Sequence, residues 1–379
     1  MTVLHTDVTI VGGGPVGLFL AVRLRSRGIH CRILERRTSV SPHSRSIGIH
    51  PPSLELFAKC GIVDAFLDQG ERIECAEVYD GSRRIGSLSF HRCPGPYRFV
   101  LSLPQSATET ILEDALRRLD PQCLLRGAEV TGLDPDDQGC LVRSSGGNGA
   151  HSIRSKIVVG CDGMNSVVRK CMGVCFQGRA YPDTYVMGDA EDDTGCRSTA
   201  CIYLAQEGLV ESFPLPGLQR RWVLKTDERM DAPSKSWFCD EIRRRTRTVL
   251  VADRVGSLHG FGIQAYVASR TVTGRIAIIG DAAHVMSPIG GQGMNVGWMD
   301  AWDLAGVLGR EVRGIEERNL DRHDRRVRNR AHRAIRRAEW NMRLGRSCRR
   351  PGLRNAFVRS ILCPPLDRVV ARALTMRWI

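Results

Sequence analysis

Short runs of apolar and β-branched residues recur along the chain, separated by segments with helical spacing. Four runs predict buried strands, because each closes on a glycine or an acidic residue; they are residues 7–11, 31–34, 157–160 and 276–279. Helical spacing follows the first run at residues 18–24 and returns at 53–59 and 104–119. Strands that alternate with helices indicate an α/β protein with a Rossmann-like sheet.

The middle of the chain follows a different pattern. Residues 183–269 contain short β patterns punctuated by proline and glycine, and helical spacing dominates after Gly293. We therefore expect three regions: a discontinuous nucleotide-binding domain (residues 1–75, 98–182 and 270–315), an inserted mainly β substrate domain (76–97 and 183–269), and a C-terminal helical region (316–379).

The first strand leads directly into a glycine-rich turn. Gly12, Gly14 and Gly17 have the spacing of a dinucleotide fingerprint, in which the first glycine makes the turn and the second admits a pyrophosphate. The third glycine allows close packing of helix and strand. Glu35 closes the next strand, where an acid can bind ribose hydroxyl groups; an exposed acid without that role is the alternative. The fingerprint alone does not separate NAD, NADP and FAD.

Two further motifs follow later strands. Residues 160–169 (GCDGMNSVVR) place Asp162 and Gly163 after a strand, and residues 280–295 (GDAAHVMSPIGGQGMN) place Asp281 before a glycine cluster that opens a helix. Glycines before a helix let backbone N–H groups approach an anion. The structural alternatives are a helix cap by Asp162 or Ser166 and an ordinary glycine-rich connection.

The three motifs, in this order over residues 5–310, resemble the FAD-dependent aromatic hydroxylases, the group typified by para-hydroxybenzoate hydroxylase. The segment around Arg45 and the helix opening at Gln105 also resemble family features. The resemblance implies that the first region binds FAD. It implies contacts to FAD from Gly12, Gly14, Pro15, Val16, Glu35, Arg36, Arg45, Gln105, Val130, Asp162, Asp281, Pro288, Gly293, Met294 and Asn295.

The same resemblance implies a reaction. NADPH or NADH would reduce FAD, O2 would form a flavin C4a-hydroperoxide, and an aromatic, polyketide or quinone-like small molecule would be hydroxylated. The cofactor carries the difficult step, so no side chain is assigned as catalytic. A flavin-dependent reductase or halogenase of the same fold, and a non-catalytic FAD- or ligand-binding protein, remain alternatives.

Several single residues have two interpretations. His284 follows the acid of the third motif, and we favour a structural role over that of a base. Tyr203, Phe213, Trp222 and Tyr266 could line a substrate pocket, although aromatic residues at alternating strand positions are more often core.

Composition narrows the partners. The net charge of +14 comes largely from arginines in residues 318–350, where they alternate with acids, alanines and histidines. This pattern is typical of a solvated helix, so we expect no nucleic-acid partner and leave peripheral contact with a membrane open. No apolar run is long enough for a transmembrane segment, and no secretory signal is visible. The 14 scattered cysteines lack zinc spacing and favour a cytoplasmic, metal-free protein. The oligomeric state stays open.

Overall fold

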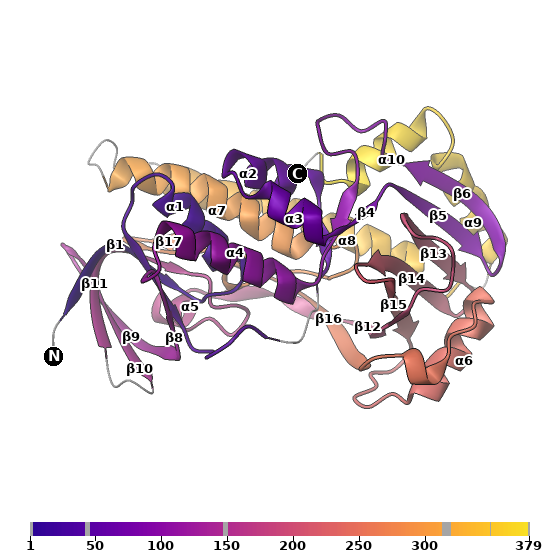
Figure 1. Cartoon of the computed structure of the whole chain (residues 1–379), viewed down its shortest axis with the longest axis horizontal. Helices are drawn as coiled ribbons and strands as arrows, with labels where there is room; N and C mark the ends of the chain where they lie inside the picture. Colours follow the sequence, from indigo (N-terminus) through magenta and orange to yellow (C-terminus); the bar gives the residue numbers. More distant parts are fainter. Residues whose placement is uncertain (1–2, 42–45, 147–150, 313–319, 349, 378–379) are drawn as a thin grey trace.

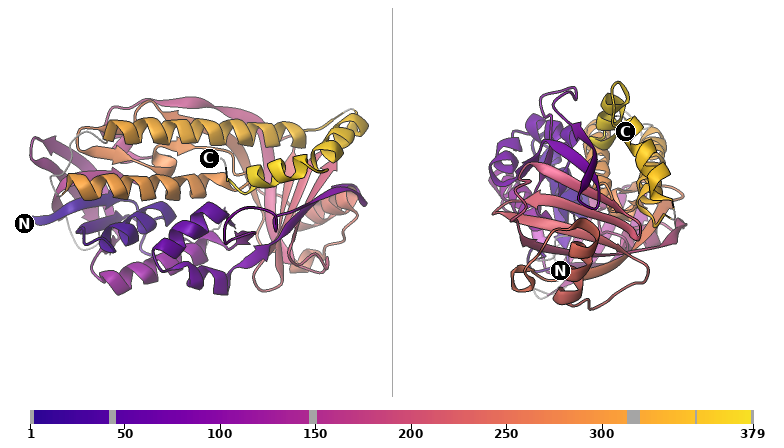
Figure 2. Two further views of the ribbon diagram at one scale, coloured as in Figure 1. Left: turned by 90° about the horizontal axis from the view of Figure 1, so that it is seen from above. Right: turned by 90° about the vertical axis from the view of Figure 1, so that its right-hand side faces the viewer.

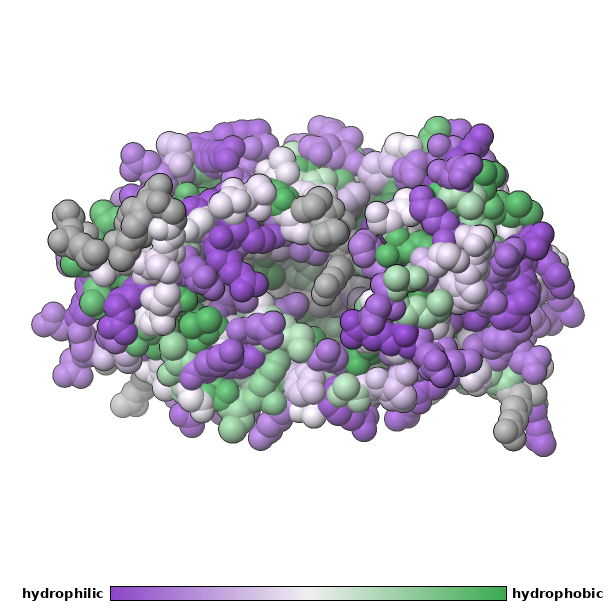
Figure 3. Space-filling view, turned by 90° about the horizontal axis from the view of Figure 1, so that it is seen from below, coloured by the Kyte–Doolittle hydropathy of each residue, from purple (hydrophilic) through white to green (hydrophobic). Residues whose placement is uncertain are grey.

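The computed structural model describes residues 3–41, 46–146, 151–312, 320–348 and 350–377. The molecule is elongated, with one large sheet near each end and helices running lengthwise between them (Figure 1). Seen from below, the surface is hollowed near its middle, with hydrophilic residues around much of the rim (Figure 3).

The central sheet carries the predicted α/β pattern. Its strand order is β17 (Val272–Thr273), β18 (Ile276–Ile278), β11 (His151–Gly160), β1 (Leu4–Val11), β2 (Cys31–Glu35) and β8 (Leu124–Arg126). Strands β18, β11, β1, β2 and β8 are parallel to their neighbours in this order. Strands β9 (Ala128–Asp136) and β10 (Gly139–Gly146) extend antiparallel from β11. The α/β fold class predicted from the sequence is confirmed.

Both faces of the central sheet are covered. On one face, α1 (Pro15–Arg25), α4 (Gln105–Leu119) and α7 (Gln292–Glu311) bury the largest apolar cluster of the protein's described core. On the other, β9, β10 and α5 (Val167–Cys171) bury a second cluster. Burial on both faces explains why these strands are continuous apolar runs and not alternating ones.

The second sheet is mostly antiparallel. Its order is β19 (His284–Val285), β16 (His259–Ala268), β12 (Phe176–Glu191), β15 (Gln219–Thr226), β14 (Gly208–Leu215), β13 (Thr199–Ala205), β5 (Cys75–Asp80) and β6 (Arg83–Ser89). One face packs against α6 (Lys235–Thr246), with η1 (Ala252–Arg254) nearby. Strands β5 and β6 thus join the sheet formed by residues 176–268, whereas the domain boundaries themselves stay a prediction.

Smaller elements connect the two sheets. Strands β3 (Gly48–Ile49), β7 (Val100–Ser102) and β4 (Glu71–Ile73) form a small sheet, accompanied by α2 (Pro51–Lys59) and α3 (Val63–Gln69). The chain ends in α8 (Leu320–Gly345), α9 (Pro351–Ile361) and α10 (Leu366–Leu374), and α8 lies beside α7 (Figure 2). Within the described residues, every helix is too short or too polar to cross a membrane.

Candidate functional site

The predicted motifs meet at one edge of the central sheet. Strand β1 pairs in parallel with β2 and β11, and β11 pairs in parallel with β18. Gly12, Glu35, Asp162 and Asp281 lie at or just beyond the carboxyl ends of these four adjacent strands. In open α/β sheets, ligands bind at this edge. The strand order therefore brings together four segments that are far apart in the sequence.

The fingerprint glycines have distinct steric roles. A Cβ on Gly12, whose φ is +105°, would lie 2.4 Å from the carbonyl oxygen of Cys161, so the first motif touches the second. A Cβ on Gly17 would lie 2.0 Å from the Gly12 carbonyl oxygen. Gly14 differs, since no heavy atom would lie within 4 Å of its Cβ. The first and third glycines permit internal packing, and the second faces open space, as a pyrophosphate site requires.

Glu35 is buried beside the fingerprint. Its Oε2 accepts a hydrogen bond from the Gly13 N–H at 2.6 Å, and its Oε1 accepts from the backbone N–H and Nε of Arg37 at 2.9 and 3.0 Å. Burial acts to raise the pKa of Glu35, but Arg37 and the Gly13 amide outweigh it and hold that pKa below its ordinary value. The group is an ionised acceptor at neutral pH. Arg36 is exposed, so the guanidinium that contacts Glu35 is the one that follows it.

Asp162 caps α5, as the structural alternative for this motif proposed. Its Oδ2 accepts from the backbone N–H groups of Val167 and Val168 at 2.6 and 3.2 Å, and Ser166 Oγ accepts from the Arg169 N–H. The other oxygen, Oδ1, is buried with no hydrogen-bond partner among the described residues. A buried carboxylate oxygen without a partner is costly, so it points to a missing donor.

Arg169 ties the second motif to the third. The buried guanidinium donates to the carbonyl oxygens of Ala282 at 2.9 Å and Met164 at 2.7 Å, and it lies 3.8 Å from the centroid of the Phe176 ring. In the sequence, this arginine is recognisable only as part of the second motif. Its position one turn into α5 is the signal that could have identified it as a brace.

The third motif runs from one sheet to the other. After β18 it forms η2 (Gly280–Ala282), where Asp281 is exposed, and it then enters β19, which pairs with β16 of the second sheet. Val16 of the fingerprint packs between Gly280 and Gly297, because a Cβ on either glycine would lie 3.2 or 2.5 Å from its Cγ2 atom. The fingerprint, the third motif and α7 therefore form one packed unit.

Helix α7 begins with an amino end that no side chain caps. Its N-cap residue is Gly291, with φ of +63°, and its first turn contains no acidic residue. Helix α1 likewise starts after Gly14 with no side-chain cap and no acid. Pro288 is exposed and accepts a hydrogen bond from the Gly291 N–H through its carbonyl oxygen. Two uncapped amino ends with positive dipoles can each hold an anionic group.

Asn295 fixes the start of α7. Its Oδ1 accepts from the His50 N–H and the Ser53 hydroxyl, both at 2.8 Å, and its Nδ2 donates to the carbonyl oxygens of Gly48 at 2.9 Å and Gly291 at 2.8 Å. The side chain is fully buried. The side chain therefore has a structural role, and only the backbone groups of Gly293, Met294 and Asn295 remain for a ligand. Gly293 and Met294 are half-buried.

The remaining predicted residues lie around this centre. Gln105 opens α4 and donates to Glu109 at 3.0 Å, and Val130 is a buried residue of β9 beside Leu34 and Val11. Arg45 lies outside the described residues. Pro15 opens α1, and its carbonyl oxygen accepts from Trp298 Nε1 at 3.0 Å. The assignment of these positions to FAD stays a prediction.

His284 has the structural setting favoured above. Its Nε2 lies 2.6 Å from Asp300 Oδ2, both side chains are fully buried, and Arg330 of α8 pairs with the same carboxylate. Two of the candidate pocket aromatics, Tyr203 and Trp222, pack against α6 in the core of the second sheet. They lie on the side of the sheet that faces away from the third motif.

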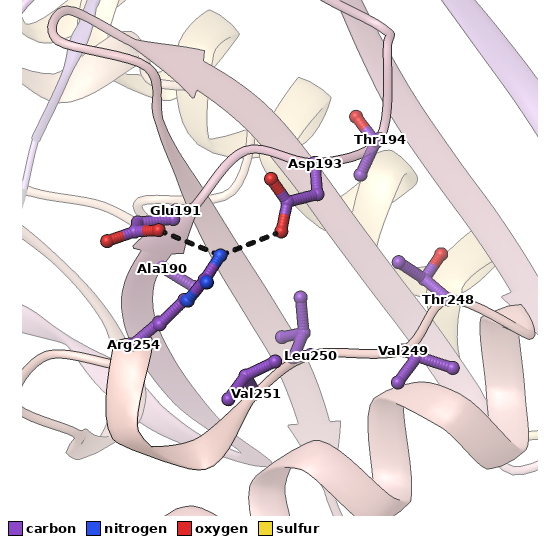
Figure 4. Close-up of a pocket in the computed structure, with 9 residues that line it drawn as sticks. All are labelled: Ala190, Glu191, Asp193, Thr194, Thr248, Val249, Leu250, Val251 and Arg254. Atoms are coloured by element: carbon purple, nitrogen blue, oxygen red, sulfur yellow. Dashed lines mark hydrogen bonds and ion pairs between the residues drawn. The ribbon is translucent and has the colours of Figure 1, made fainter.

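A pocket of about 130 Å³ lies beside the carboxyl end of β12 in the second sheet, where Arg254 pairs with Glu191 and Asp193 (Figure 4). Its described lining residues include none of the predicted site residues. Its lining contains these ion pairs, and it is separate from the site at the central sheet.

The residues at the central sheet fit FAD. The open space next to Gly14 and the amino end of α1, which no side chain caps, suit a pyrophosphate. The Asp162 Oδ1 has no partner among the described residues and can accept a hydrogen bond from a ligand. At α7, the side-chain Oε1 of Gln292 is also buried without a partner among the described residues. These features define a nucleotide-binding α/β protein with a second anion-stabilising helix end.

Comparison with known proteins names the class. The sequence model of the FAD binding domain family matches residues 5–338. The rifampicin monooxygenase of Streptomyces venezuelae is 31% identical over 315 residues, covering 81% of this chain and 65% of that protein. The 12-dehydrotetracycline 5-monooxygenase/anhydrotetracycline 6-monooxygenase of Streptomyces rimosus is 30% identical over 328 residues, covering 82% and 64%. The chain belongs to the FAD binding domain family of FAD-dependent aromatic hydroxylases, as predicted from its three motifs.

Solved structures agree. The anhydrotetracycline hydroxylase of Streptomyces rimosus has a TM-score of 0.82 at 26% identity, covering 99% of this chain and 77% of that one. The p-nitrophenol 4-monooxygenase of Pseudomonas putida has a TM-score of 0.90 at 22% identity, covering both chains in full, which shows the shared fold. The chain spans slightly less than two thirds of the length of the two monooxygenase sequences above.

Proposed function

We propose that this protein is an FAD-dependent monooxygenase that uses NADPH or NADH and O2 to hydroxylate an aromatic or polycyclic small molecule. The observation that carries the proposal is the convergence of three motifs on two uncapped helix ends at one sheet edge. When bound, FAD would supply the redox chemistry that activates O2, so that one oxygen atom of O2 enters the substrate ring and the other leaves as water.

The side chains and backbone around FAD have separate tasks. Glu35 accepts hydrogen bonds from the adenosine ribose, the α1 amino end binds the pyrophosphate, and Asp281 binds the ribityl region. Backbone N–H groups of Gly293 and Met294 stabilise negative charge at the flavin ring, with the α7 dipole behind them. Arg169 and Asn295 hold these segments in register without touching the reacting atoms.

The relatives support an aromatic substrate, and their named substrates include both polycyclic and single-ring molecules. Rifampicin and anhydrotetracycline are substrates named for two relatives, and pentachlorophenol is named for a further relative that is 28% identical. A reductase or a halogenase of the same fold, or a protein that binds FAD and ligand without turnover, would have the same FAD site. Product analysis separates these alternatives.

The first test asks whether the purified protein retains or rebinds FAD. A yellow protein whose NADH or NADPH oxidation accelerates with an aromatic ligand, and whose product gains one oxygen, supports the proposal. A protein that cannot be reconstituted with FAD contradicts it. A product that gains a halogen or hydrogen identifies one of the alternatives.

A second proposal concerns location. We place the protein in the cytoplasm, with peripheral attraction to anionic membrane, because all 14 cysteines are free and α8 has an exposed basic face. Trp340 on α8 is half exposed and packs edge-on against Phe357 of α9, with 6.2 Å between the ring centroids. Exposed arginines beside an amphipathic aromatic residue are the composition of an interfacial surface.

A further inference from the structure

One face of the second sheet combines an acid with apolar and aromatic side chains. In the antiparallel register, Glu211 of β14 lies opposite Val223 of β15 and Ile202 of β13, and Val223 lies opposite Met187 of β12. Directly opposed residues point to the same side of a sheet, so these four side chains share a face. Tyr185, two residues before Met187, belongs to that face too.

This face looks toward the expected flavin end of the site. Tyr185, Met187 and Val223 form one apolar cluster with Ile289, which lies in the third motif just before α7, and with Met342 of α8. The opposite face carries Tyr203 and Trp222 and packs on α6. The Glu211 side is therefore the side on which a ligand could lie between the sheet and the start of α7.

Glu211 is a buried acid without a counter-ion. Only 7% of it is exposed, and it makes no hydrogen bond or ion pair with any residue in the described parts of the chain. Neighbouring ions on this side have other partners: Arg221 binds Asp189 through two hydrogen bonds, and Arg346 binds Asp183 in the same way. The buried Lys225, which lies opposite Tyr185, has its Nζ 4.0 Å from the exposed Asp227. Burial raises the pKa of Glu211 to about 7.

Tyr185 supplies a second unsatisfied group. Its ring is 1% exposed and stacks on Phe261 at 5.7 Å, and its hydroxyl is buried with no hydrogen-bond partner within the described structure. Burial and the nearby charge of Glu211 raise the pKa of this hydroxyl, so it stays a neutral donor. Buried polar groups almost always have partners, and two such exceptions on one face point to a ligand.

We propose that Glu211 and Tyr185 form the substrate's polar anchor, and that the substrate is an aromatic molecule with a free ring hydroxyl and no carboxylate near it. The inference deepens the proposed function and rests on it. The Glu211 carboxylate accepts the hydrogen bond of the ring hydroxyl, and Tyr185 donates to the same oxygen. A carboxylate-bearing ring would place a second negative charge beside Glu211 and would be rejected.

The anchor also activates the ring. The substrate O–H bond breaks, its proton forms a new O–H bond on Glu211, and the electron pair stays on the substrate oxygen as phenolate. The phenolate ring is more electron-rich than the phenol and accepts an electrophilic oxygen more readily. The ring carbon that gains the oxygen then loses its hydrogen as a proton to solvent, which makes the ring aromatic again, and Glu211 returns its own proton to the original hydroxyl oxygen. The exchange at that hydroxyl involves only the substrate and Glu211.

Binding measurements test the anchor independently of turnover. Three matched probes, 2-naphthol, 2-methoxynaphthalene and 2-naphthoate, are titrated into the FAD-loaded protein by calorimetry. We expect the wild type to bind 2-naphthol about tenfold more tightly than the other two, a difference typical of one buried charged hydrogen bond. Equal binding of the three probes, or no binding of any, overturns the assignment.

Variants identify the groups responsible. Glu211→Leu should abolish the preference for the hydroxyl, and Glu211→Gln should remove the discrimination against 2-naphthoate, because both lack the negative charge. Tyr185→Phe should weaken the binding of 2-naphthol about threefold and leave the binding of 2-methoxynaphthalene unchanged. Glu129→Gln, an exposed strand position in β9, is the control for losing a glutamate. Unchanged selectivity in folded, FAD-loaded Glu211 variants overturns the proposal.

Turnover separates this inference from the proposed function. With a substrate found by screening, Glu211→Gln should lower kcat about a hundredfold while KM changes much less, as removal of a proton acceptor does. If the wild type hydroxylates that substrate and the variant matches its kcat, the Glu211 role is wrong and the proposed function stands. If the wild type hydroxylates nothing, the proposed function fails, and the binding titration still decides the anchor.

Discussion

Two glycines of the fingerprint give the sharpest contrast between folding and cofactor binding. A methyl group on Gly17 would lie 2.0 Å from a backbone oxygen, whereas a methyl group on Gly14, with φ of −79°, would meet nothing within 4 Å. We expect Gly17→Ala to destabilise the FAD-free protein by about 1–3 kcal/mol, the usual cost of overpacking. Gly14→Ala should leave the FAD-free protein unchanged in thermal unfolding but weaken FAD binding about tenfold or more.

The measurement is a melting curve without FAD and a flavin fluorescence titration on each variant. Gly163→Ala is unsuitable as a control, because φ of +77° would strain an alanine there. Gly306→Ala in α7 is the better match, since its Cβ also meets nothing within 4 Å and it lies away from the amino end. An unchanged FAD affinity in the Gly14→Ala variant would mean that the pyrophosphate binds at another place.

Glu211 should make stability depend on pH in a direction opposite to most carboxylates. Its folded pKa of about 7 lies above the ordinary value near 4, so the folded state binds more protons between these values. The resulting penalty is absent below the unfolded pKa, grows as pH rises toward 7, and is complete above it. Glu211→Gln removes it, and urea unfolding should show the variant gaining roughly 2 kcal/mol on the wild type between pH 5 and pH 8. A gain independent of pH would mean that Glu211 ionises normally.

The amino end of α7 is the element on which the site depends most. Asn295→Ala would leave the His50 N–H, the Ser53 hydroxyl and two carbonyl oxygens without their partner, at a cost of about 2–4 kcal/mol. Because the same bonds position the backbone N–H groups of Gly293 and Met294, FAD release should accelerate as well. Stopped-flow flavin fluorescence measures the release. Ser53→Ala removes one of the four hydrogen bonds and should have a small effect on the stability and on the rate of FAD release. An equally small effect of Asn295→Ala would mean that its side chain does not hold the start of α7 in place.

The same element shows why the sequence predicted only part of the site. The glycines, strand ends and helix starts are local patterns, and the strand order of a Rossmann-like sheet brings them together in a known way. Three of the four partners of Asn295 lie more than 240 positions away, so its side chain could not be assigned from the pattern. Glu211 was missed for a related reason, since alternation shows which residues share a face but not what that face meets.

Helix α8 also differs from its sequence interpretation. The arginine-rich run predicted a solvated helix, and several of its arginines are exposed. Arg330, however, is 9% exposed and pairs with Asp300 and Asp303 of α7, where Asp300 also holds His284. A periodic charge pattern cannot distinguish an arginine facing water from one facing a carboxylate on another helix.

At the scale of the whole molecule, the order of motifs predicted the architecture because the third motif is a physical link. It leaves the central sheet at β18, joins the second sheet as β19 and returns as α7. About twenty residues of continuous chain, from Ile276 to Asn295, therefore connect the proposed FAD site at the central sheet with the proposed substrate-binding face of the second sheet.

The net charge of +14 leads to the last prediction. We expect the protein to sediment with vesicles of phosphatidylserine and phosphatidylcholine at low salt, and to be released as salt screens the attraction, because each arginine near an anionic surface contributes about 1 kcal/mol. Replacing exposed Arg325 and Arg333 of α8 by glutamate should abolish sedimentation. The same charge change at exposed Arg118 and Arg229 should reduce it only slightly, if α8 and not overall charge is responsible. Equal losses would assign the attraction to net charge, and sedimentation with pure phosphatidylcholine would assign it to apolar contacts around Trp340.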